Sequence, residues 1–289
     1  KGTHYLRPIN YFEKRGSAQC KTCIMLSSLN VPGITKITAK NSRDHTEKMF
    51  QSLKLPIKIK KSSNYDIITL SKPSILNKFD FDIPGDISSA SFFIVLTLLS
   101  KNSKINLKNI NINPTRIGVI KILNMMGAKI KFDNIRIVNG ERCADIKVRS
   151  IDNFKGIKCP AALNSAAIDE FLIIFLVAAK AKGISYFKDL SELNQKESPR
   201  LKWGSKILNK IGIKNILTEN SIKIFGNPDL KVNKKIIIKG FLKDHRVFMT
   251  SVIAALSFGG KWQIFDKESI NTSFPSFLKK VDYLGAKID

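Results

Sequence analysis

Charged side chains of both signs gather in three short stretches of the sequence, each beside a strongly apolar segment. The stretches read "IDEF", "NQKESPR" and "DHR", and their charged residues are Asp169, Glu170, Lys196, Glu197, Arg200, Asp244, His245 and Arg246. Charges at this density are costly to bury unless they meet one another or a charged ligand. Carboxylates can transfer protons, while guanidinium and ammonium groups bind phosphate and carboxylate. The three stretches together predict an enzyme that acts on phosphorylated, acidic substrates.

Small polar or acidic residues begin each of the apolar segments. We predict four enclosed helices, near residues 17–29, 88–100, 166–183 and 244–260. The N-terminus of a helix carries unpaired N–H groups and a partial positive charge, so Ser or Asp there caps the helix and can face an anion. Ser17, Asp86, Ser88 and Ser89 stand at two such starts. Each alone is an ordinary cap, but several converging helix ends would make an anion site.

A repeated plan positions these segments along the chain. Four stretches share it, at 45–70, 116–138, 205–225 and 274–289. Each is an amphipathic helix followed by an alternating strand, and all but the last run through a turn into a second strand. Three of the helices stop at Gly127, Gly212 and Gly285, and the fourth has Lys54 at that position. Helices and short strands that alternate in this way predict an α/β architecture of repeated units that pack around one another.

The composition sets bounds on size, partners and location. The chain has 289 residues, 43% of them apolar, and this length suits two domains better than one. Its net charge of +26 comes mainly from lysines scattered along the sequence, and the densest group, "IKIKKSS" at 57–63, alternates like the solvated face of a strand. This indicates general attraction for anions rather than a nucleic-acid site. The longest uninterrupted apolar run, 171–179, is too short to cross a bilayer.

The four cysteines do not form a recognisable metal-binding set. Cys20 and Cys23 are three residues apart in a helical stretch, while Cys143 and Cys159 stand alone. No second close pair of Cys or His completes a four-ligand zinc site. We therefore expect core or partly buried thiols and a reducing cytoplasm.

A family resemblance joins the motifs described above. The sequence resembles the enolpyruvyl transferase family, in its 5-enolpyruvylshikimate-3-phosphate synthase branch. The resemblance rests on "SAQCKTCIMLSSLNVPG", "SRDHTEKMF", "PGDISSASFF", "NPTRIGVIKILNMMGAKI", "IDEF", "KESPR", "DHRVFM" and "TSFPSFLKKVDYLGAKI", which follow one another in the family's order along essentially the whole chain.

The resemblance implies a two-domain, inverse α/β barrel-like enolpyruvyl transferase fold built from βαβαββ units. We place the remainder of the N-terminal domain at 1–108 and the C-terminal domain at 109–289. The implied reaction transfers the enolpyruvyl group of phosphoenolpyruvate to the 5-hydroxyl of shikimate 3-phosphate and releases phosphate, a step toward chorismate and the aromatic amino acids. The family needs no metal or organic cofactor. We expect no nucleic-acid or membrane partner, and a monomer when complete.

The resemblance also assigns roles to residues. Asp169 matches the base near the 5-hydroxyl, Glu197 matches the acid at C3 of phosphoenolpyruvate, and His245 supports proton transfer or positioning. The residues that match shikimate 3-phosphate contacts are Ser17, Ala18 through its backbone, Gln19, Arg43, Asp169 and Lys196. Those that match phosphoenolpyruvate contacts are Gln19, Arg200 and Arg246.

Two substitutions and one gap depart from the family pattern. Pro199 stands where the family usually has Asp, so a carboxylate that could orient Arg200 is missing, and Asn194 stands where Arg is usual. Thr272 replaces a lysine of the enteric type, as it does in the subgroup resembled here. The family's "GDKS"-type motif would precede Lys1. We therefore expect the chain alone to be nearly inactive, as part of a larger enzyme.

Two other functions are open to the sequence. One is the related transfer of an enolpyruvyl group to UDP-N-acetylglucosamine. The motifs "SRDHTEKM" and "KESPR" disfavour it, because they resemble the shikimate branch of the family. The other is a non-catalytic product of a degraded gene that binds polyanions, for which salt-sensitive nucleic-acid binding would be the sign.

Overall fold

The chain forms two compact units, which we call unit 1 and unit 2. The computed structural model describes residues 5–75 and 77–287. Unit 1 comprises the described residues up to Pro84 together with Asn111–Arg116 and Ile135–Cys143. Unit 2 comprises Gly85–Ile110, Ile117–Asn134 and the described residues from Ala144 onward. The chain therefore passes between the two units five times.

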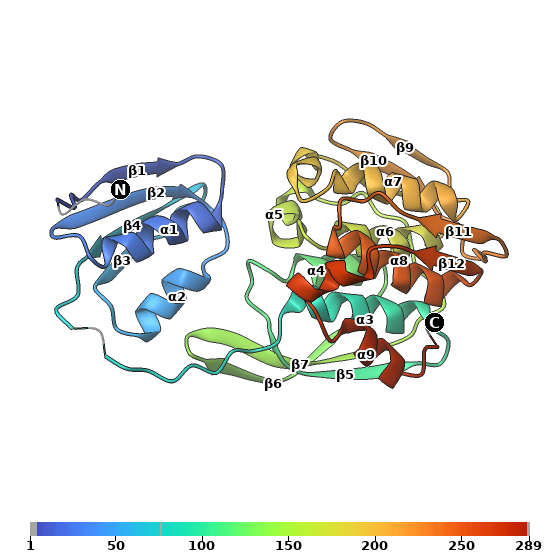
Figure 1. Ribbon diagram of the computed structural model, residues 1–289, viewed down its shortest axis with the longest axis horizontal. Coiled ribbons are helices and arrows are strands. Elements are labelled where there is room, and N and C mark those ends of the chain that lie inside the picture. The colour runs from blue at the N-terminus through green and yellow to red at the C-terminus, as the bar shows by residue number, and fades with distance from the viewer. Residues whose placement is uncertain (1–4, 76, 288–289) are drawn as a thin grey trace. The chain divides into compact units, whose positions relative to one another are not determined.

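Unit 1 contains one complete βαβαββ repeat. Its elements are β1 (Asn10–Glu13), α1 (Ala18–Ser28), β2 (Ile34–Lys40), α2 (His45–Ser52), β3 (Ile57–Lys60) and β4 (Tyr65–Ser71). The strands form a sheet in the order β1-β2-β4-β3, in which β1 and β2 are parallel and β4 is antiparallel to both β2 and β3. Both helices lie against this sheet (Figure 1).

The core of unit 1 follows from the periods of its elements. Ile37 and Ala39 are two apart on β2, so their side chains point to one face of the sheet, and β4 adds two more apolar residues to that face. Met25 of α1 and Phe50 of α2 pack on these strand residues, and each is almost fully buried. The other face of β3 carries lysines, as the alternating "IKIK" predicts.

Unit 2 surrounds apolar helices with short sheets. Its helices are α3 (Ile87–Leu99), α4 (Gly118–Met125), α5 (Asn164–Ala167), α6 (Phe171–Lys180), α7 (Arg200–Lys210), α8 (His245–Phe258) and α9 (Phe277–Tyr283), with short 3-10 helices at Ala161–Leu163, Ser191–Gln195 and Lys267–Thr272. Its strands are β8 (Ile184–Phe187), β9 (Asn215–Leu217), β10 (Ile222–Phe225), β11 (Lys235–Ile238) and β12 (Lys261–Ile264). Three more strands are divided between the units, namely β5 (Lys104–Asn111), β6 (Lys131–Val138) and β7 (Glu141–Arg149).

The enclosed helices predicted for unit 2 are confirmed. All nine apolar residues of α6, 171–179, are buried, and most residues of α3 and α8 are buried as well. These helices lie in the middle of the unit, with β9 and β10 on one side and β11 and β12 on another (Figure 1). A helix that is apolar around its whole circumference needs this enclosure.

The repeated plan predicted from the sequence is confirmed at 45–70, 116–138 and 205–225, where each helix is followed by two strands, whereas the strand expected at the end of 274–289 extends into residues outside the described ones. After α4, α7 and α9 the chain turns at Gly127, Gly212 and Gly285 with φ values of +109°, +85° and +95°. These left-handed conformations end a helix at little cost when the residue is glycine. Lys54 adopts the same conformation after α2, with φ +55°. Each of the four stretches is also preceded by a parallel pairing, formed in chain order by β1 with β2, Gly85 with Ile110, 155–158 with 182–186, and β11 with β12.

The domain boundary after residue 108 stays a prediction, and the two compact units divide the chain at other positions. That boundary falls inside β5, whereas the first passage between the compact units lies between Pro84 and Gly85. The physical reason is α3, which stands beside α6 and α8 and whose Phe92 contacts Phe277 edge to face. Residues 85–110 therefore pack with unit 2 instead of with the beginning of the chain.

Helix α1 differs from its predicted enclosure. It buries only Lys21, Met25 and Ser28, which are spaced as one helical face, and it exposes Cys20 and Cys23. The expectation that these two thiols are core or partly buried was therefore wrong, because only the narrow face of Lys21, Met25 and Ser28 is buried and both cysteines lie outside it. Across residues 5–75 and 77–287, no helix is both long and apolar enough to span a membrane.

Candidate functional site

Unit 2 brings together the catalytic residues predicted from "IDEF" and "NQKESPR". Asp169 lies in the turn before α6, and Arg200 is the first residue of α7. Arg200 Nη1 donates to Asp169 Oδ1 at 3.3 Å, and Arg200 Nη2 donates to the carboxylate of Glu197. The Arg200 side chain is only 2% exposed, whereas that of Glu197 is 55% exposed. One buried guanidinium thus joins both carboxylates expected to move protons.

Asp244 holds the other edge of Arg200. Its Oδ2 accepts from Arg200 Nε at 2.9 Å and from the Ser198 hydroxyl at 2.8 Å, and its Oδ1 accepts from Arg200 Nη2 at 3.3 Å. Asp244 also caps α8 by accepting from the backbone N–H of Arg246. Burial by itself would raise the pKa of Asp244, but the hydrogen bond and charge of Arg200 outweigh it and hold that pKa below its usual value.

A second buried carboxylate contacts Arg246. Arg246 Nη1 donates to the backbone oxygen of Asp169 at 3.0 Å and lies 3.7 Å from Glu170 Oε1. The Ser88 hydroxyl, in the first turn of α3, donates to the same Glu170 oxygen. Ser88 was predicted as a cap, but the cap of α3 is Asp86, which accepts from the backbone N–H of Ser89. The hydroxyl of Ser88 therefore connects α3 to the start of α6.

Lys196 and His245 complete this set in unit 2. Lys196 Nζ lies 3.7 Å from Asp169 Oδ1 and 2.9 Å from Glu192, so it adds a second cation beside Asp169. His245 is the first residue of α8, directly after the Asp244 cap. Burial and the charge of Arg246 lower the pKa of His245 below its usual value, which favours the neutral imidazole.

The remaining predicted site residues lie in unit 1. Ser17 caps α1 by accepting from the backbone N–H of Cys20 at 3.2 Å. Ala18 and Gln19 form the first turn of that helix, and Gln19 is exposed. Arg43 lies in the loop between β2 and α2. This placement agrees with the polar helix start expected for Ser17.

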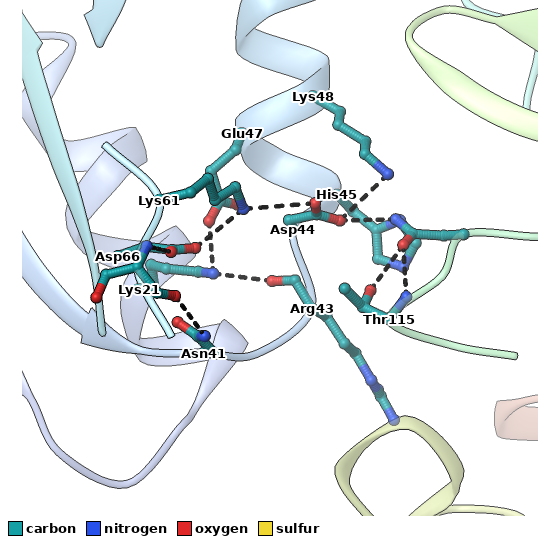
Figure 2. A network of polar contacts seen from close by, with 12 residues as sticks. Lys21, Asn41, Arg43, Asp44, His45, Glu47, Lys48, Lys61, Asp66 and Thr115 are labelled. Atoms are coloured by element: carbon teal, nitrogen blue, oxygen red, sulfur yellow. Dashed lines mark hydrogen bonds and ion pairs between the residues drawn. The ribbon is translucent and has the colours of Figure 1, made fainter. Parts of the chain in front are cut away.

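A network of polar contacts surrounds the loop that carries Arg43 (Figure 2). Asp44 accepts from Asn113 Nδ2 at 2.8 Å and pairs with Lys48 at 3.3 Å. His45 Nδ1 lies 2.5 Å from Glu141 Oε1. Burial opposes ionisation of both carboxyl groups, but their hydrogen bonds, from Asn113 to Asp44 and from His45 to Glu141, together with nearby lysines, hold both pKa values below the usual range.

Sequence reasoning missed several residues that hold the charged groups. Some of them had been noted as charges or helix caps, but none as a binding partner of a charged group. They are Lys21, Glu47, Ser88, Glu170, Ser198 and Asp244. Lys21 and Met25 are four apart on α1, so the helical period alone places this lysine on the buried face. No such signal exists for Asp244, because its contact with Arg200 joins residues 44 apart in sequence.

Metal ligands do not gather at these sites. Across residues 5–75 and 77–287, no group of three or more His, Cys, Asp or Glu side chains is arranged to hold a metal ion. What the set in unit 2 offers is paired carboxylates for proton transfer and forked guanidinium groups for anions.

Solved structures show which class of fold this is. The enolpyruvyl transferase NikO from Streptomyces tendae has a TM-score of 0.71 at 13% identity, covering 99% of this chain and 66% of that one, which establishes the fold alone. The EPSP synthase from Acinetobacter baumannii has a TM-score of 0.88 at 35% identity, covering 98% of this chain and 64% of that one. The enolpyruvyl transferase fold implied by the family resemblance is confirmed.

Sequence comparison places the chain within one family of that class. The sequence model for EPSP synthase (3-phosphoshikimate 1-carboxyvinyltransferase) matches residues 1–281, and the chain belongs to this family. A 3-phosphoshikimate 1-carboxyvinyltransferase from Ruthia magnifica subsp. Calyptogena magnifica is 39% identical over 290 residues, covering 100% of this chain and 65% of the relative. One from Petrotoga mobilis is 38% identical over 277 residues, covering 96% and 62%. The chain thus spans just under two thirds of the length of these relatives.

The two departures from the family pattern have local explanations. Pro199 removes a carboxylate expected to orient Arg200, but Asp244 already contacts both the Nε and Nη2 atoms of that guanidinium. Proline also suits its position, because it directly precedes the first residue of α7. Asn194 bonds to main-chain atoms, accepting from Lys202 N–H and donating to the oxygen of Glu219.

Proposed function

We propose that the protein carrying this chain transfers the enolpyruvyl group of phosphoenolpyruvate to the 5-hydroxyl of shikimate 3-phosphate and releases phosphate. Membership of the EPSP synthase family supports this reaction. The observation that carries it is that Asp169 and Glu197 both accept hydrogen bonds from the buried Arg200. The reaction needs two carboxylates beside a cation, because one proton leaves an oxygen while another enters and leaves a carbon.

In this proposal Asp169 takes the proton of the 5-hydroxyl as its oxygen attacks C2 of phosphoenolpyruvate. Glu197, in its protonated form, gives a proton to C3, and a tetrahedral intermediate results. The C2–O bond to phosphate then breaks and the leaving phosphate takes the proton that Asp169 had accepted. The carboxylate of Glu197 takes a proton back from C3, and the C2–C3 double bond forms again. The side chain of Glu197 is 55% exposed, so a substrate atom can approach its carboxylate.

The cations hold the acidic groups of the two substrates in the same proposal. Arg200 and Arg246 bind the carboxylate and phosphate of phosphoenolpyruvate, since planar guanidinium groups match both anions. Lys196 contacts shikimate 3-phosphate beside Asp169, from which its Nζ is 3.7 Å. Neutral His245, with its lowered pKa, supports positioning rather than charge.

Contacts to shikimate 3-phosphate are also assigned to residues of unit 1. They are Ser17, the backbone of Ala18, Gln19 and Arg43, with Gln19 approaching phosphoenolpyruvate as well. The first turn of α1 supports this, because its N–H groups and partial positive charge favour a phosphate. We further propose that the complete protein is a cytoplasmic monomer without a nucleic-acid partner.

The test is phosphate release by the full-length gene product supplied with shikimate 3-phosphate and phosphoenolpyruvate. We expect turnover in the unaltered protein and a loss of at least about 100-fold in kcat for Asp169→Asn and for Glu197→Gln. Glu219→Gln is the matched control, since Glu219 is exposed in the turn between β9 and β10. Turnover with a UDP-sugar acceptor instead would contradict the proposal. Equal rates for all three variants would contradict the assigned roles.

A further inference from the structure

A lysine and a glutamate are buried together behind the loop that carries Arg43. Lys21 lies on α1 and Glu47 on α2, and their side chains are 3% and 2% exposed. The Lys21 Nζ atom is 2.5 Å from Glu47 Oε1. Within the described residues, neither carboxylate oxygen of Glu47 accepts a hydrogen bond of good geometry, so positive charge compensates it, from Lys21 in direct contact and from the more distant Lys61. Burying two charges for packing alone is unfavourable compared with apolar side chains of similar size.

The ammonium group of Lys21 has a second partner. It donates to the backbone oxygen of Arg43 at 2.9 Å, across 22 residues of sequence. A hydrogen bond from a charged donor is stronger than one between neutral groups. Glu47 holds the ammonium group in place, and the ammonium group in turn fixes the main chain at Arg43.

The residue after Arg43 is fixed from another side. Asp44 accepts from Asn113, pairs with Lys48, and lies 3.7 Å from Lys61 Nζ. The main chain at Arg43 is therefore held on both sides, by Lys21 and through Asp44. Figure 2 shows the Arg43 side chain extending away from this network. Lys21 therefore acts on Arg43 through its backbone oxygen.

We propose that Lys21 and Glu47 are positioning residues for shikimate 3-phosphate, because their buried ion pair fixes the backbone from which Arg43 reaches the substrate's phosphate. This inference rests on the proposed function. An arginine is a long side chain with many rotamers, so anchoring its backbone lowers the entropy lost when the guanidinium binds an anion. The pair itself touches no substrate.

The experiment measures binding of shikimate 3-phosphate by calorimetry to the full-length gene product, together with Tm. We expect Lys21→Met to raise the Kd about 10-fold and to lower Tm, because it leaves Glu47 buried without the ammonium group that contacts it. The double variant Lys21→Met/Glu47→Leu removes both charges and recovers Tm, yet keeps the raised Kd, since the bond to the Arg43 oxygen is still missing. Lys58→Met, at an exposed position on β3, changes neither value.

A double-mutant cycle shows whether the effect passes through Arg43. Arg43→Ala weakens binding of shikimate 3-phosphate, and adding Lys21→Met to it changes the Kd less than 2-fold. The KM for phosphoenolpyruvate stays within 2-fold of the unaltered protein in Lys21→Met/Glu47→Leu. Unaltered affinity for shikimate 3-phosphate in Lys21→Met/Glu47→Leu would overturn this inference but not the proposed function. So would a Kd in the variant that combines Lys21→Met and Arg43→Ala raised by the product of the two single effects. An unaltered protein that does not bind shikimate 3-phosphate would overturn the proposed function and the inference with it.

Discussion

Replacing Asp244 with asparagine tests how the buried Arg200 is held. The change keeps the size of the side chain but removes the charge that accepts from Arg200 Nε at 2.9 Å and from Nη2 at 3.3 Å. Removing one partner of a buried ion pair costs about 3–5 kcal/mol. Arg200 keeps Asp169 at 3.3 Å and the exposed Glu197. We therefore expect a loss of about 2–4 kcal/mol in the free energy of unfolding.

Urea unfolding and calorimetry measure this loss. At about 2–4 °C per kcal/mol for a protein of this order of size, Tm should fall by roughly 4–16 °C. Ser198→Ala is the matched control, because it removes a neutral donor from the same carboxylate at 2.8 Å and should cost about 1 kcal/mol. A loss below about 1 kcal/mol for Asp244→Asn would refute the reasoning, because Asp169 and Glu197 would then suffice to compensate Arg200.

The same variant has an expected pH signature. The folded pKa of Asp244 lies below the unfolded value of about 3.9, so its contribution to stability is present above that pH. The contribution is lost as the pH falls through the folded pKa. Asp244→Asn should therefore unfold with a shallower dependence on acid than the unaltered protein.

Three further outcomes are expected. Gly226→Ala should destabilise the protein by about 1–3 kcal/mol or more in urea unfolding, because the new Cβ would lie 2.1 Å from the backbone oxygen of Ala181; an unchanged midpoint would contradict the packing. At pH 8 a thiol reagent should label the two exposed cysteines of α1 quickly and leave Cys159 unreacted, because burial raises the pKa of the Cys159 thiol to about 11. Rapid labelling of Cys159 together with those two cysteines would contradict this. Burial lowers the pKa of His245 below about 6.5, so the stability it contributes is present above that pH and is lost as the pH falls through the folded pKa. In urea unfolding between pH 8 and pH 5, the free energy of unfolding should fall less for His245→Gln than for the unaltered protein. An equal fall in both proteins would contradict a neutral imidazole in the folded state.

The regular parts of the fold could be predicted because local signals agree with the packing. The continuous apolar sequence predicted an enclosed helix near 166–183, where α6 lies at Phe171–Lys180, and glycines marked helix ends, including Gly127 with its φ of +109°. Lys54 could be aligned with these glycines only through the repeat, since lysine itself does not indicate a left-handed conformation. The boundary between compact units could not be read locally, because it depends on which unit α3 packs against.

The charged residues of the candidate site could be found, but their partners could not. Density of charge beside apolar helices pointed to Asp169 and Arg200, and the structure joins them at 3.3 Å. The missing carboxylate at Pro199 suggested a poorly oriented Arg200, whereas Asp244 supplies the orientation from a position 44 residues later. Burial of Ser88 against Glu170 is likewise a long-range contact, across 82 residues, that no motif spacing indicates.

The discontinuity of unit 1 affects the order in which the protein can fold during synthesis. Asp44 accepts from Asn113 and His45 pairs with Glu141, so α2 depends on segments that are made much later. At about 5–20 residues per second, a ribosome needs roughly 3–12 s to pass from the end of the first segment of unit 1, Pro84, to Cys143. During that interval the sheet and helices of unit 1 can form, but the polar end of α2 lacks its partners. A nascent chain released before Cys143 should therefore be a target for chaperones or proteases, because its first unit is still incomplete.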